Sequence, residues 1–374
     1  MDLGNFVKQS QGFKAFVPGP FPPKEHLVLD DQAIDLLSRA TLVVGRLDGI
    51  TQLLPDVDFF IFMYVRKEAS LSSQIEGTNA TMSDSIKAEN DITINLPSDV
   101  DDIQHYIQAM NFGLKKLASL PLSVRLLREV HKVLLTSARS THFAAPGELR
   151  NSQNWIGGGS PATARFVPPP HHLVPDALGD LELFLHTSDD IPLLIKTGWA
   201  HAQFETIHPF LDGNGRTGRL LIAFYLCQQG VLQLPVLYIS EYFKRHRESY
   251  FDLLEGYHNR GEVLPWIKFF LEGVAVVAEE AIETSRKINI LREKDVQKVY
   301  AMGRSGKMGM ILLQNLFKLP IVTIKKVQEF TGLSRPNATK LVDRFVAGGI
   351  LEQVDKKKEY GRSFVYKKYF DLFK

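Results

Sequence analysis

The chain has 374 residues, which is too long for one ordinary domain and suits two or three. Apolar residues make up 44% and charged residues 23%, a balance that excludes general disorder, a collagen-like chain and a small disulfide scaffold. No stretch approaches the ~18 apolar residues of a membrane span, and the first residues lack the apolar core of a signal peptide. Because Cys227 is the single cysteine, no internal disulfide can form, and we expect a cytoplasmic protein without a membrane partner.

Charge is distributed unevenly along the chain. Residues 300–374 contain 15 Lys and Arg against 6 Asp and Glu, a net charge of +9. Residues 1–299 carry a net charge of −7. A mildly acidic body therefore carries a basic tail, and nucleic acid is a candidate partner of that tail.

The predicted elements are mainly helical. Residues 1–25 predict an irregular arm, because VPGPFPP breaks helices and favours an extended path. Apolar spacing becomes helical from about Asp31. A helix from about Val57 ends near Gly77, and further helices are predicted at about 99–118, 122–136, 174–187, 191–205, 216–229, 240–256 and 263–290. Residues 154–170 have two short apolar ends around a Gly/Pro-rich turn, which predicts a β-hairpin or flap.

The last 75 residues predict a separate small domain. A helix at about 307–318 precedes a second short helix, a turn at Gly332, and a third helix that begins near Ser334. Two apolar-ended strands around a charged turn follow. This order is typical of a winged helix-turn-helix over residues 300–374.

The densest polar segment is HPFLDGNGRTGR, from His208 to Arg219, between two predicted helices. Its glycines let successive backbone N–H groups point inward, and the following helix adds its positive end, so the segment suits an anion. The guanidinium groups of Arg216 and Arg219 suit a polyphosphate. Asp212 supplies a hard oxygen ligand for Mg²⁺ held jointly with phosphates. His208 can accept a proton from an attacking hydroxyl.

Other interpretations of this segment fit less well. Gly213, Gly215 and Gly218 spell the G-x-G-x-x-G of dinucleotide folds, but that pattern should follow a strand, and the preceding residues predict a helix. An EF-hand loop from Asp212 would need Glu where Ala223 stands. A Walker A lysine pattern is absent from the sequence. A glycine-rich helix start with surface arginines explains neither the histidine nor the aspartate.

The same twelve residues match the Fic-domain signature H-x-F-x-[DE]-G-N-G-R-x-x-R without departure. The chain thus resembles Fic-domain protein adenylyltransferases. The resemblance implies AMP transfer from ATP to a Tyr, Ser or Thr hydroxyl of a target protein, on an all-helical core with a β-hairpin flap. It implies an N-terminal helical region over 1–98 that contains an inhibitory helix, and a catalytic core over 99–295.

Roles carry over from the family residue by residue. The resemblance makes His208 the general base, assigns Mg²⁺ to Asp212, and makes Phe210 the wedge that seats the loop. The phosphates of ATP are assigned to Gly213, Asn214, Gly215, Arg216, Thr217, Gly218 and Arg219. Tyr250, in RESYF, stands where relatives contact adenosine, and the flap over 154–170 would hold the target segment by strand addition.

A second segment resembles the inhibitory motif of the same family, [ST]-x-x-x-E-[GN]. It comprises Ser72 to Gly77, and Ser72 and Glu76 are four residues apart, so both lie on one helix face. The resemblance implies that Glu76 pairs with Arg219 and obstructs the γ-phosphate of ATP. The ordinary alternative is a solvent-facing glutamate before a helix-capping glycine.

Two further functions remain open. A DNA-binding regulator with a secondary Fic domain is favoured by Arg335, Lys340 and Arg344 on the second tail helix and by the lysines at 356–358, although a winged helix also serves as a protein-docking module. A hydrolase that removes AMP would use the same residues, with Glu76 positioning a water. Target protein, modified residue and nucleotide base are unspecified, and self-association is compatible with the sequence.

One pair of residues outside these motifs has the spacing of two metal ligands on one helix face. His201 and Glu205 are four residues apart on a predicted helix, but they have no third ligand at a useful spacing. We therefore expect packing and solvated surface there.

Overall fold

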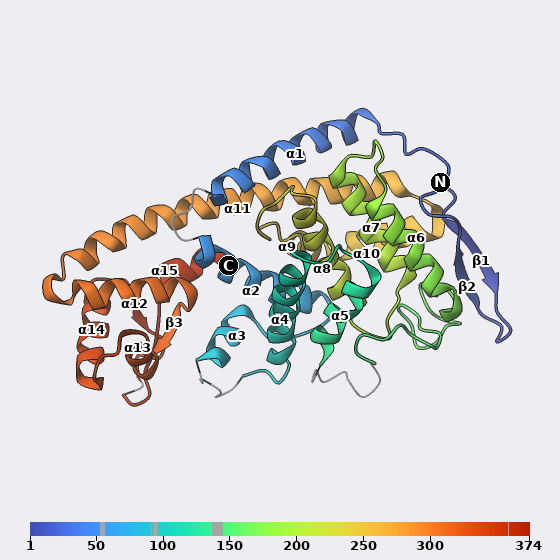
Figure 1. The fold of residues 1–374 in the computed structure, drawn as a ribbon. Coiled ribbons are helices and arrows are strands. Elements are labelled where there is room, and N and C mark those ends of the chain that lie inside the picture. The colour runs from blue at the N-terminus through green and yellow to red at the C-terminus, as the bar shows by residue number, and fades with distance from the viewer. Residues whose placement is uncertain (53–56, 91, 93–95, 137–144, 358) are drawn as a thin grey trace.

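A computed structural model describes residues 1–52, 57–90, 92, 96–136, 145–357 and 359–374, with the side chains of 57–60 outside the description. Within these residues the chain is mostly helical, with two small antiparallel sheets. Figure 1 shows the helical body, the N-terminal strands at one end and the C-terminal region at the other. None of the described helices is long and apolar enough to cross a membrane.

The N-terminal residues form a β-hairpin, so the prediction of an irregular arm over 1–25 is wrong for this part. Strands β1 (Gly4–Lys8) and β2 (Lys14–Pro18) pair antiparallel, with Phe6 opposite Phe16. The prolines that suggested an arm begin only at the end of β2. Phe6 and Phe16 pack against Phe166, so contacts with a distant segment stabilise the two strands.

The helices of the N-terminal region and the core follow the predicted order, except that the short helix α3 (Met82–Glu89) was not predicted. Their bounds are α1 (Asp31–Gln52), α2 (Val57–Ile75), α3 (Met82–Glu89), α4 (Val100–Leu117), α5 (Val124–Leu135), α6 (Val174–His186), α7 (Leu193–Ile207), α8 (Asn214–Gln228), α9 (Ser240–Arg245), α10 (Arg247–Arg260) and α11 (Val263–Tyr300). The predicted helix at 240–256 is divided at His246, whose backbone is not helical. Helix α11 runs past the predicted end near 290 and leads into the C-terminal region, alongside α1 for much of its length (Figure 1).

Helices α7 and α8 form the centre of the core. Every residue of α7 from Leu194 to Ile207 is buried, so none of these residues forms a solvent-exposed face. Gly198 permits close packing, because a Cβ there would lie 2.6 Å from the ring of Phe270. The indole N–H of Trp266 donates to the Gly198 carbonyl at 2.7 Å. The loop that joins α7 to α8 is therefore held by two buried helices.

The C-terminal region contains the predicted helix, turn and helix. Its elements are α12 (Gly306–Lys318), β3 (Ile321–Thr323), α13 (Ile324–Thr331), α14 (Arg335–Ala347), β4 (Glu352–Gln353), β5 (Ser363–Val365) and α15 (Lys367–Phe370). The strands form an antiparallel sheet in the order β3-β5-β4. Gly332, at φ 69°, ends α13 in the left-handed conformation. Lys358 of the predicted charged turn lies outside the described residues.

The C-terminal region packs against α2 and α11. Phe373 meets the ring of Tyr64 on α2 at 5.3 Å, edge to face. The amide of Asn90, at the end of α3, donates to the carbonyl of Ile321 at 2.7 Å. The hydroxyl of Tyr366 donates to the buried carboxylate of Asp295 on α11 at 2.7 Å.

We predict that Tyr366→Phe lowers the free energy of unfolding by about 1–3 kcal/mol, because the buried carboxylate oxygen of Asp295 that accepts from Tyr366 would lose this hydrogen bond. Denaturant-induced unfolding measures the change. Tyr360→Phe is the matched control, since Tyr360 is 85% exposed and its hydroxyl should matter by less than about 0.5 kcal/mol. Equal effects of the two substitutions would contradict the assignment.

Candidate active site

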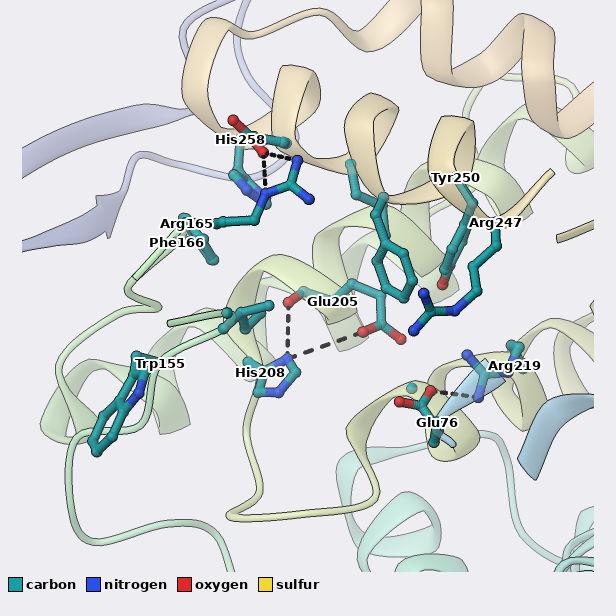
Figure 2. A pocket seen from close by; sticks show the side chains of 16 residues that line it. Glu76, Trp155, Arg165, Phe166, Glu205, His208, Arg219, Arg247, Tyr250 and His258 are labelled. Carbon is teal, nitrogen blue, oxygen red and sulfur yellow. Dashed lines mark hydrogen bonds and ion pairs between the residues drawn. The ribbon is translucent and has the colours of Figure 1, made fainter. Parts of the chain in front are cut away.

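A pocket of about 470 Å³ opens where α2, the flap, the α7–α8 loop and α10 converge. From the 208–219 motif it is lined by His208, Gly215 and Arg219 (Figure 2). Glu76 and Tyr250 complete the set of predicted residues that the fold brings together here. The other predicted phosphate-binding residues do not line the pocket.

His208 ends α7 with a left-handed backbone, at φ 49°. This conformation is uncommon for a residue other than glycine, and such strain gathers at functional positions. Its Nδ1 lies 3.3 Å from the carbonyl oxygen of Glu205, so the tautomer that donates there leaves Nε2 as an acceptor. Burial lowers the pKa of His208 to about 4, and the charge of Arg150 acts in the same direction. A neutral imidazole able to accept a proton therefore stands at this position at pH 7.

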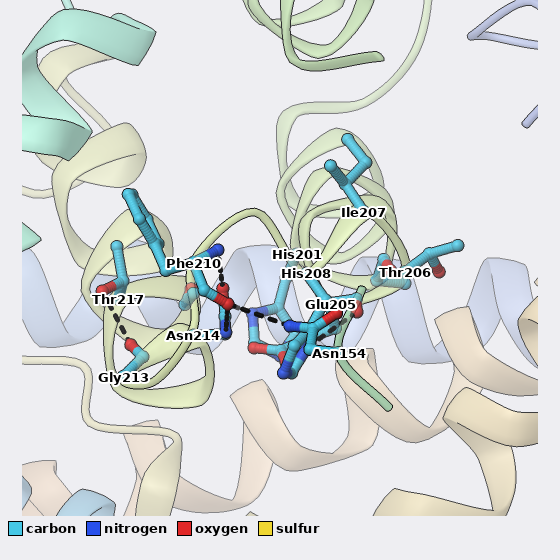
Figure 3. Close-up of polar contacts among 12 residues, drawn as sticks. Asn154, His201, Glu205, Thr206, Ile207, His208, Phe210, Gly213, Asn214 and Thr217 are labelled. Carbon is cyan, nitrogen blue, oxygen red and sulfur yellow. Dashed lines mark hydrogen bonds and ion pairs between the residues drawn. The ribbon is translucent and has the colours of Figure 1, made fainter. Parts of the chain in front are cut away.

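The loop after His208 is held by amide side chains (Figure 3). Asn214 accepts a hydrogen bond from the Phe210 N–H and donates to the Phe210 carbonyl, both at 2.8 Å. Asn154 donates to the same carbonyl at 3.0 Å. Phe210 is buried and stacks on His131 at 3.7 Å, as the wedge role predicts. Because the amide of Asn214 is engaged within the loop, only its backbone N–H is left to face a phosphate.

Thr217 and Gly218 also have structural contacts. The Thr217 hydroxyl donates to the carbonyl of Gly213 at 2.8 Å, which closes the first turn of α8. The carbonyl of Gly218 lies 2.9 Å from Nδ1 of His201. Thr217 and Gly218 are not among the residues that line the pocket, so their phosphate role stays a prediction.

Asp212 is not among the residues that line the pocket, and its side chain is 43% exposed. One carboxylate oxygen accepts the N–H of Gly213 at 2.6 Å, and the other lies 3.7 Å from Arg216. Among the described residues, no group of three or more His, Cys, Asp and Glu side chains could hold a metal ion. A single accessible carboxylate nevertheless suits Mg²⁺, which usually shares its coordination between one or two carboxylates and the phosphates of a substrate.

Arg219 is a buried cation that is held by the last turn of α2 and the residue that follows it. Its Nε donates to the hydroxyl of Ser72 at 2.8 Å and its Nη2 donates to the Ser72 carbonyl at 2.9 Å. Nη2 also pairs with Oε1 of Glu76 at 2.7 Å. A Cβ on Gly215 would lie 2.1 Å from that oxygen, so the carboxylate of Glu76 rests against the first turn of α8. Glu76 is thus paired with Arg219, a residue distant in sequence, rather than simply solvated.

Tyr250 lies in the pocket wall and is itself buried. Its hydroxyl lies 3.0 Å from Nε2 of His201, and its ring stacks on Phe243 at 4.4 Å. The predicted contact with adenosine is compatible with this position and stays a prediction.

The flap over 154–170 contains no strand; all of its residues are described. A single bridge joins Ile156 and Phe166, and the N–H of Ile156 donates to the carbonyl of Phe166 at 2.8 Å. The predicted hairpin is therefore a hairpin-shaped loop, because its glycines and prolines prevent a longer ladder. Its C-terminal end is tied to the N-terminal hairpin, since the N–H of Phe16 donates to the carbonyl of Val167.

Sequence reasoning missed Arg150. This residue is buried, and its guanidinium donates to the carbonyls of Pro169, Ile207 and His208. Arg150 thus ties the end of the flap to the α7–α8 loop. Burial lowers its pKa to about 10, so it keeps its charge at pH 7. A lone arginine between a helix and a loop carries no sequence signal of this role.

The expectation of solvated surface at Glu205 is wrong. Glu205 is 8% exposed and lines the pocket, because α7 is buried on every side. His201, four residues before Glu205, is also buried, and burial lowers the pKa of His201 to about 3. A further buried histidine, His258, stacks on Phe166 at 3.6 Å and lines the same pocket.

Comparison with known proteins identifies the family. The Fic/DOC family N-terminal model matches residues 34–115, and the Fic/DOC family model matches residues 121–226, about half of the chain together. This chain carries Fic/DOC family domains. The second match contains the motif from His208 to Arg219, and the first contains Ser72 and Glu76.

Curated relatives of these Fic domains are similar over part of their length. A probable protein adenylyltransferase of Aquifex aeolicus is 35% identical over 107 residues, which are 29% of this chain and 32% of that protein. The protein adenylyltransferase Fic of Aedes aegypti is 32% identical over 128 residues, which are 34% of this chain and 23% of the relative. The chain thus spans about a quarter to a third of the length of these relatives.

Solved structures share the Fic fold. A Fic family protein from Desulfovibrio desulfuricans G20 superimposes with a TM-score of 0.60 at 18% identity, over 92% of this chain and 98% of that one. A Fic domain containing signalling protein from Bacteroides thetaiotaomicron gives 0.53 at 17% identity, over 68% and 97% of the two chains. At such identities the likeness concerns the fold alone.

We predict that the His208 ring of this Fic domain titrates at about pH 4 rather than near the usual 6.5, because burial disfavours the imidazolium ion. The ring takes up its proton near pH 6.5 in the unfolded chain but only near pH 4 in the folded chain. The stability that the neutral ring contributes is therefore complete above about pH 6.5 and is lost as pH falls through about 4. Long-range ¹H–¹⁵N spectra follow the ring, with His208→Gln as the assignment control. A His208 midpoint at or above 6.5 would refute the prediction.

Proposed function

We propose that this protein is a protein adenylyltransferase that transfers AMP from ATP to a hydroxyl side chain of a target protein and is held inactive by Glu76. One observation carries the proposal: a single pocket joins His208, the start of α8 and Arg219, with the Glu76 carboxylate lying on the same anion-binding surface. The names of the relatives support the same chemistry.

The chain's own residues can perform the transfer. His208 accepts the proton of the target hydroxyl, whose oxygen attacks the α-phosphorus of ATP. A bond forms between that oxygen and phosphorus, the bond to the bridging oxygen breaks, and pyrophosphate leaves. The N–H groups at the start of α8 and the guanidinium of Arg219 would neutralise phosphate charge during this step. Mg²⁺ held by Asp212 would add positive charge beside the phosphates when bound.

The brake follows from the Arg219 ion pair. Glu76 uses the Nη2 group that an outer phosphate would need, and its carboxylate rests against Gly215. A nucleotide bound in the transferring orientation would have to displace Glu76, because two anions cannot share this space. The protein target would dock on the flap, where Trp155 is 41% exposed next to the bridged residue Ile156.

We predict that Glu76→Gly raises transfer of label from ATP labelled on the α-phosphate by about tenfold or more, because a preference of only about 1.4 kcal/mol for the Glu76 ion pair already gives that factor. Adding His208→Ala should lower the raised rate by about 10²–10⁴-fold. The measurement is label on protein bands in a cell lysate. Glu248→Ala, which removes an exposed carboxylate from α10, is the control and should behave as the parent.

Absence of label in all these proteins would reject AMP transfer. Mass spectrometry of an adenylylated target then tests the reverse reaction, in which Glu76 would position the attacking water. Loss of AMP from the target that requires both Glu76 and His208 would favour the hydrolase.

The C-terminal region supports a second candidate function, in which it acts as a winged helix-turn-helix that binds DNA. Helix α14 exposes Arg335, Lys340 and Arg344. A hollow of about 280 Å³ between α12 and α14 is lined by Lys340, Arg344 and Arg304, with no carboxylate among the described residues that line it. Exposed cations on a helix that follows a tight turn suit the phosphates of a duplex.

We predict that the affinity for a labelled DNA duplex falls steeply between about 50 and 200 mM salt, and that Lys340→Gln with Arg344→Gln lowers the slope of log K against log salt by about 2. Fluorescence anisotropy gives the slope. Lys287→Gln, on the exposed face of α11, is the control and should leave the slope unchanged. A salt-independent signal, or no binding, would reject DNA in favour of a protein-docking role.

A further inference from the structure

Glu205 is a polar group that neither the motif nor the fold accounts for. It lies on α7 three residues before His208 and lines the pocket. Figure 2 shows its carboxyl group between the His208 ring and the Arg219 guanidinium. Oε2 lies 4.0 Å from Nδ1 of His208, and Oε1 receives a hydrogen bond from none of the described residues.

An unpaired carboxyl at this depth is costly for a residue that only fills space. A buried polar atom without a partner costs about 1–3 kcal/mol, and most such atoms in folded proteins are paired. The helix opposite makes room for it, since a Cβ on Gly218 would lie 2.4 Å from Oε1 of Glu205. Oε1 is thus enclosed against α8, whereas Oε2 lies beside His208 in the pocket wall and is the oxygen that a ligand can reach.

The surroundings of Glu205 disfavour its charged form. Arg219 on α8 is already paired with Glu76, and the ring of His208 on the following loop is neutral at pH 7. His201 on the same helix is also neutral, and the hydroxyl of Tyr250 on α10 is directed to it. Burial raises the pKa of Glu205 to about 8, with Arg219 opposing and Glu76 reinforcing the rise. The carboxyl group therefore carries its proton at pH 7.

We propose that Glu205 binds the phosphate chain of the nucleotide by donating a hydrogen bond from its protonated carboxyl group. The inference rests on the proposed function and adds to the site a contact that the motif does not contain. A protonated carboxyl has one O–H donor, whereas an ionised one only accepts and would repel a phosphate in a low-dielectric wall. The position beside both His208 and Arg219 places this donor along the path between the attacked phosphorus and the outer phosphates.

The proposal gives a signed dependence on pH. The binding-competent form of Glu205 is complete well below pH 8 and is lost as pH rises through about 8. Above that pH the protonated fraction falls about tenfold per unit, and the apparent affinity falls with it. Since bound phosphate favours the proton, the midpoint should move upward when nucleotide is present.

The test uses the full chain carrying Glu76→Gly, so that the anion surface is open, and measures KM for ATP and kcat from pH 6 to 9.5. We predict that KM rises as pH passes the midpoint of Glu205, which lies below about 8 in this background because the Glu76 charge that raises its pKa is removed. The rise should approach tenfold per unit, and Glu205→Gln in the same background should abolish it, because glutamine keeps an N–H donor and does not ionise. Glu205→Ala should raise KM at all pH values. Glu248→Gln is the control and should retain the pH-dependent rise. Thermal midpoints of all variants establish that each is folded.

The outcomes separate the inference from the proposed function. A rise in KM that persists in Glu205→Gln, or a flat KM in the Glu76→Gly parent, overturns the role of Glu205 while AMP transfer stands. ATP binding measured by calorimetry replaces KM if no transfer is found. The predicted pH profile in that assay, without transfer, would support the Glu205 contact and reject the adenylyltransferase.

Discussion

The pairing of one buried cation determines how the site is built. Arg219 is almost fully enclosed, and a buried charge without a partner costs about 3–5 kcal/mol. Ser72 and Glu76 supply that partner from a segment more than a hundred residues away. The same guanidinium is the strongest candidate for an outer phosphate. A phosphate that displaces Glu76 would keep Arg219 paired, so the proposed inhibited and nucleotide-bound forms would each leave this charge with a partner.

The position of Glu76 depends on contacts near the middle and at the end of α2. Near its middle, α2 presents Tyr64 to Tyr238 of the body and to Phe373 at the chain's end. At its end, Ser72 is fully buried against Arg219. The segment that carries the carboxylate is therefore fixed by packing against the C-terminal region as well as by the ion pair. Its placement is a property of the whole chain rather than of the six-residue motif.

Burial also sets the charge of the pocket wall. The imidazoles of His201, His208 and His258 remain neutral at pH 7 because their surroundings disfavour the imidazolium ion. Glu205 is neutral for the corresponding reason. Positive charge facing the pocket is thus concentrated on arginines, whose pKa is too high for burial to discharge them. This arrangement suits a polyanionic substrate and keeps a proton acceptor available beside it.

The sequence by itself determined the features that depend on neighbouring residues. The helix order, the turn at Gly332 and the glycine-rich loop after His208 follow from short-range periodicity and backbone freedom, which sequence patterns record directly. A signature of fixed spacing likewise identified the family domains that the comparisons found. These predictions needed no knowledge of which surfaces meet.

Only the tertiary structure decided which side chains are buried and which partners they contact. Strands β1 and β2 exist because Phe6 and Phe16 meet Phe166, and the arm prediction missed them. Glu205 lies in the pocket because α7 is covered on every side, and a helix without a polar face has no periodicity from which to read orientation. The tertiary structure likewise decided that the amide of Asn214 bonds to Phe210 within the loop rather than facing the pocket. Burial and pairing depend on partners distant in sequence, and local patterns do not encode those distances.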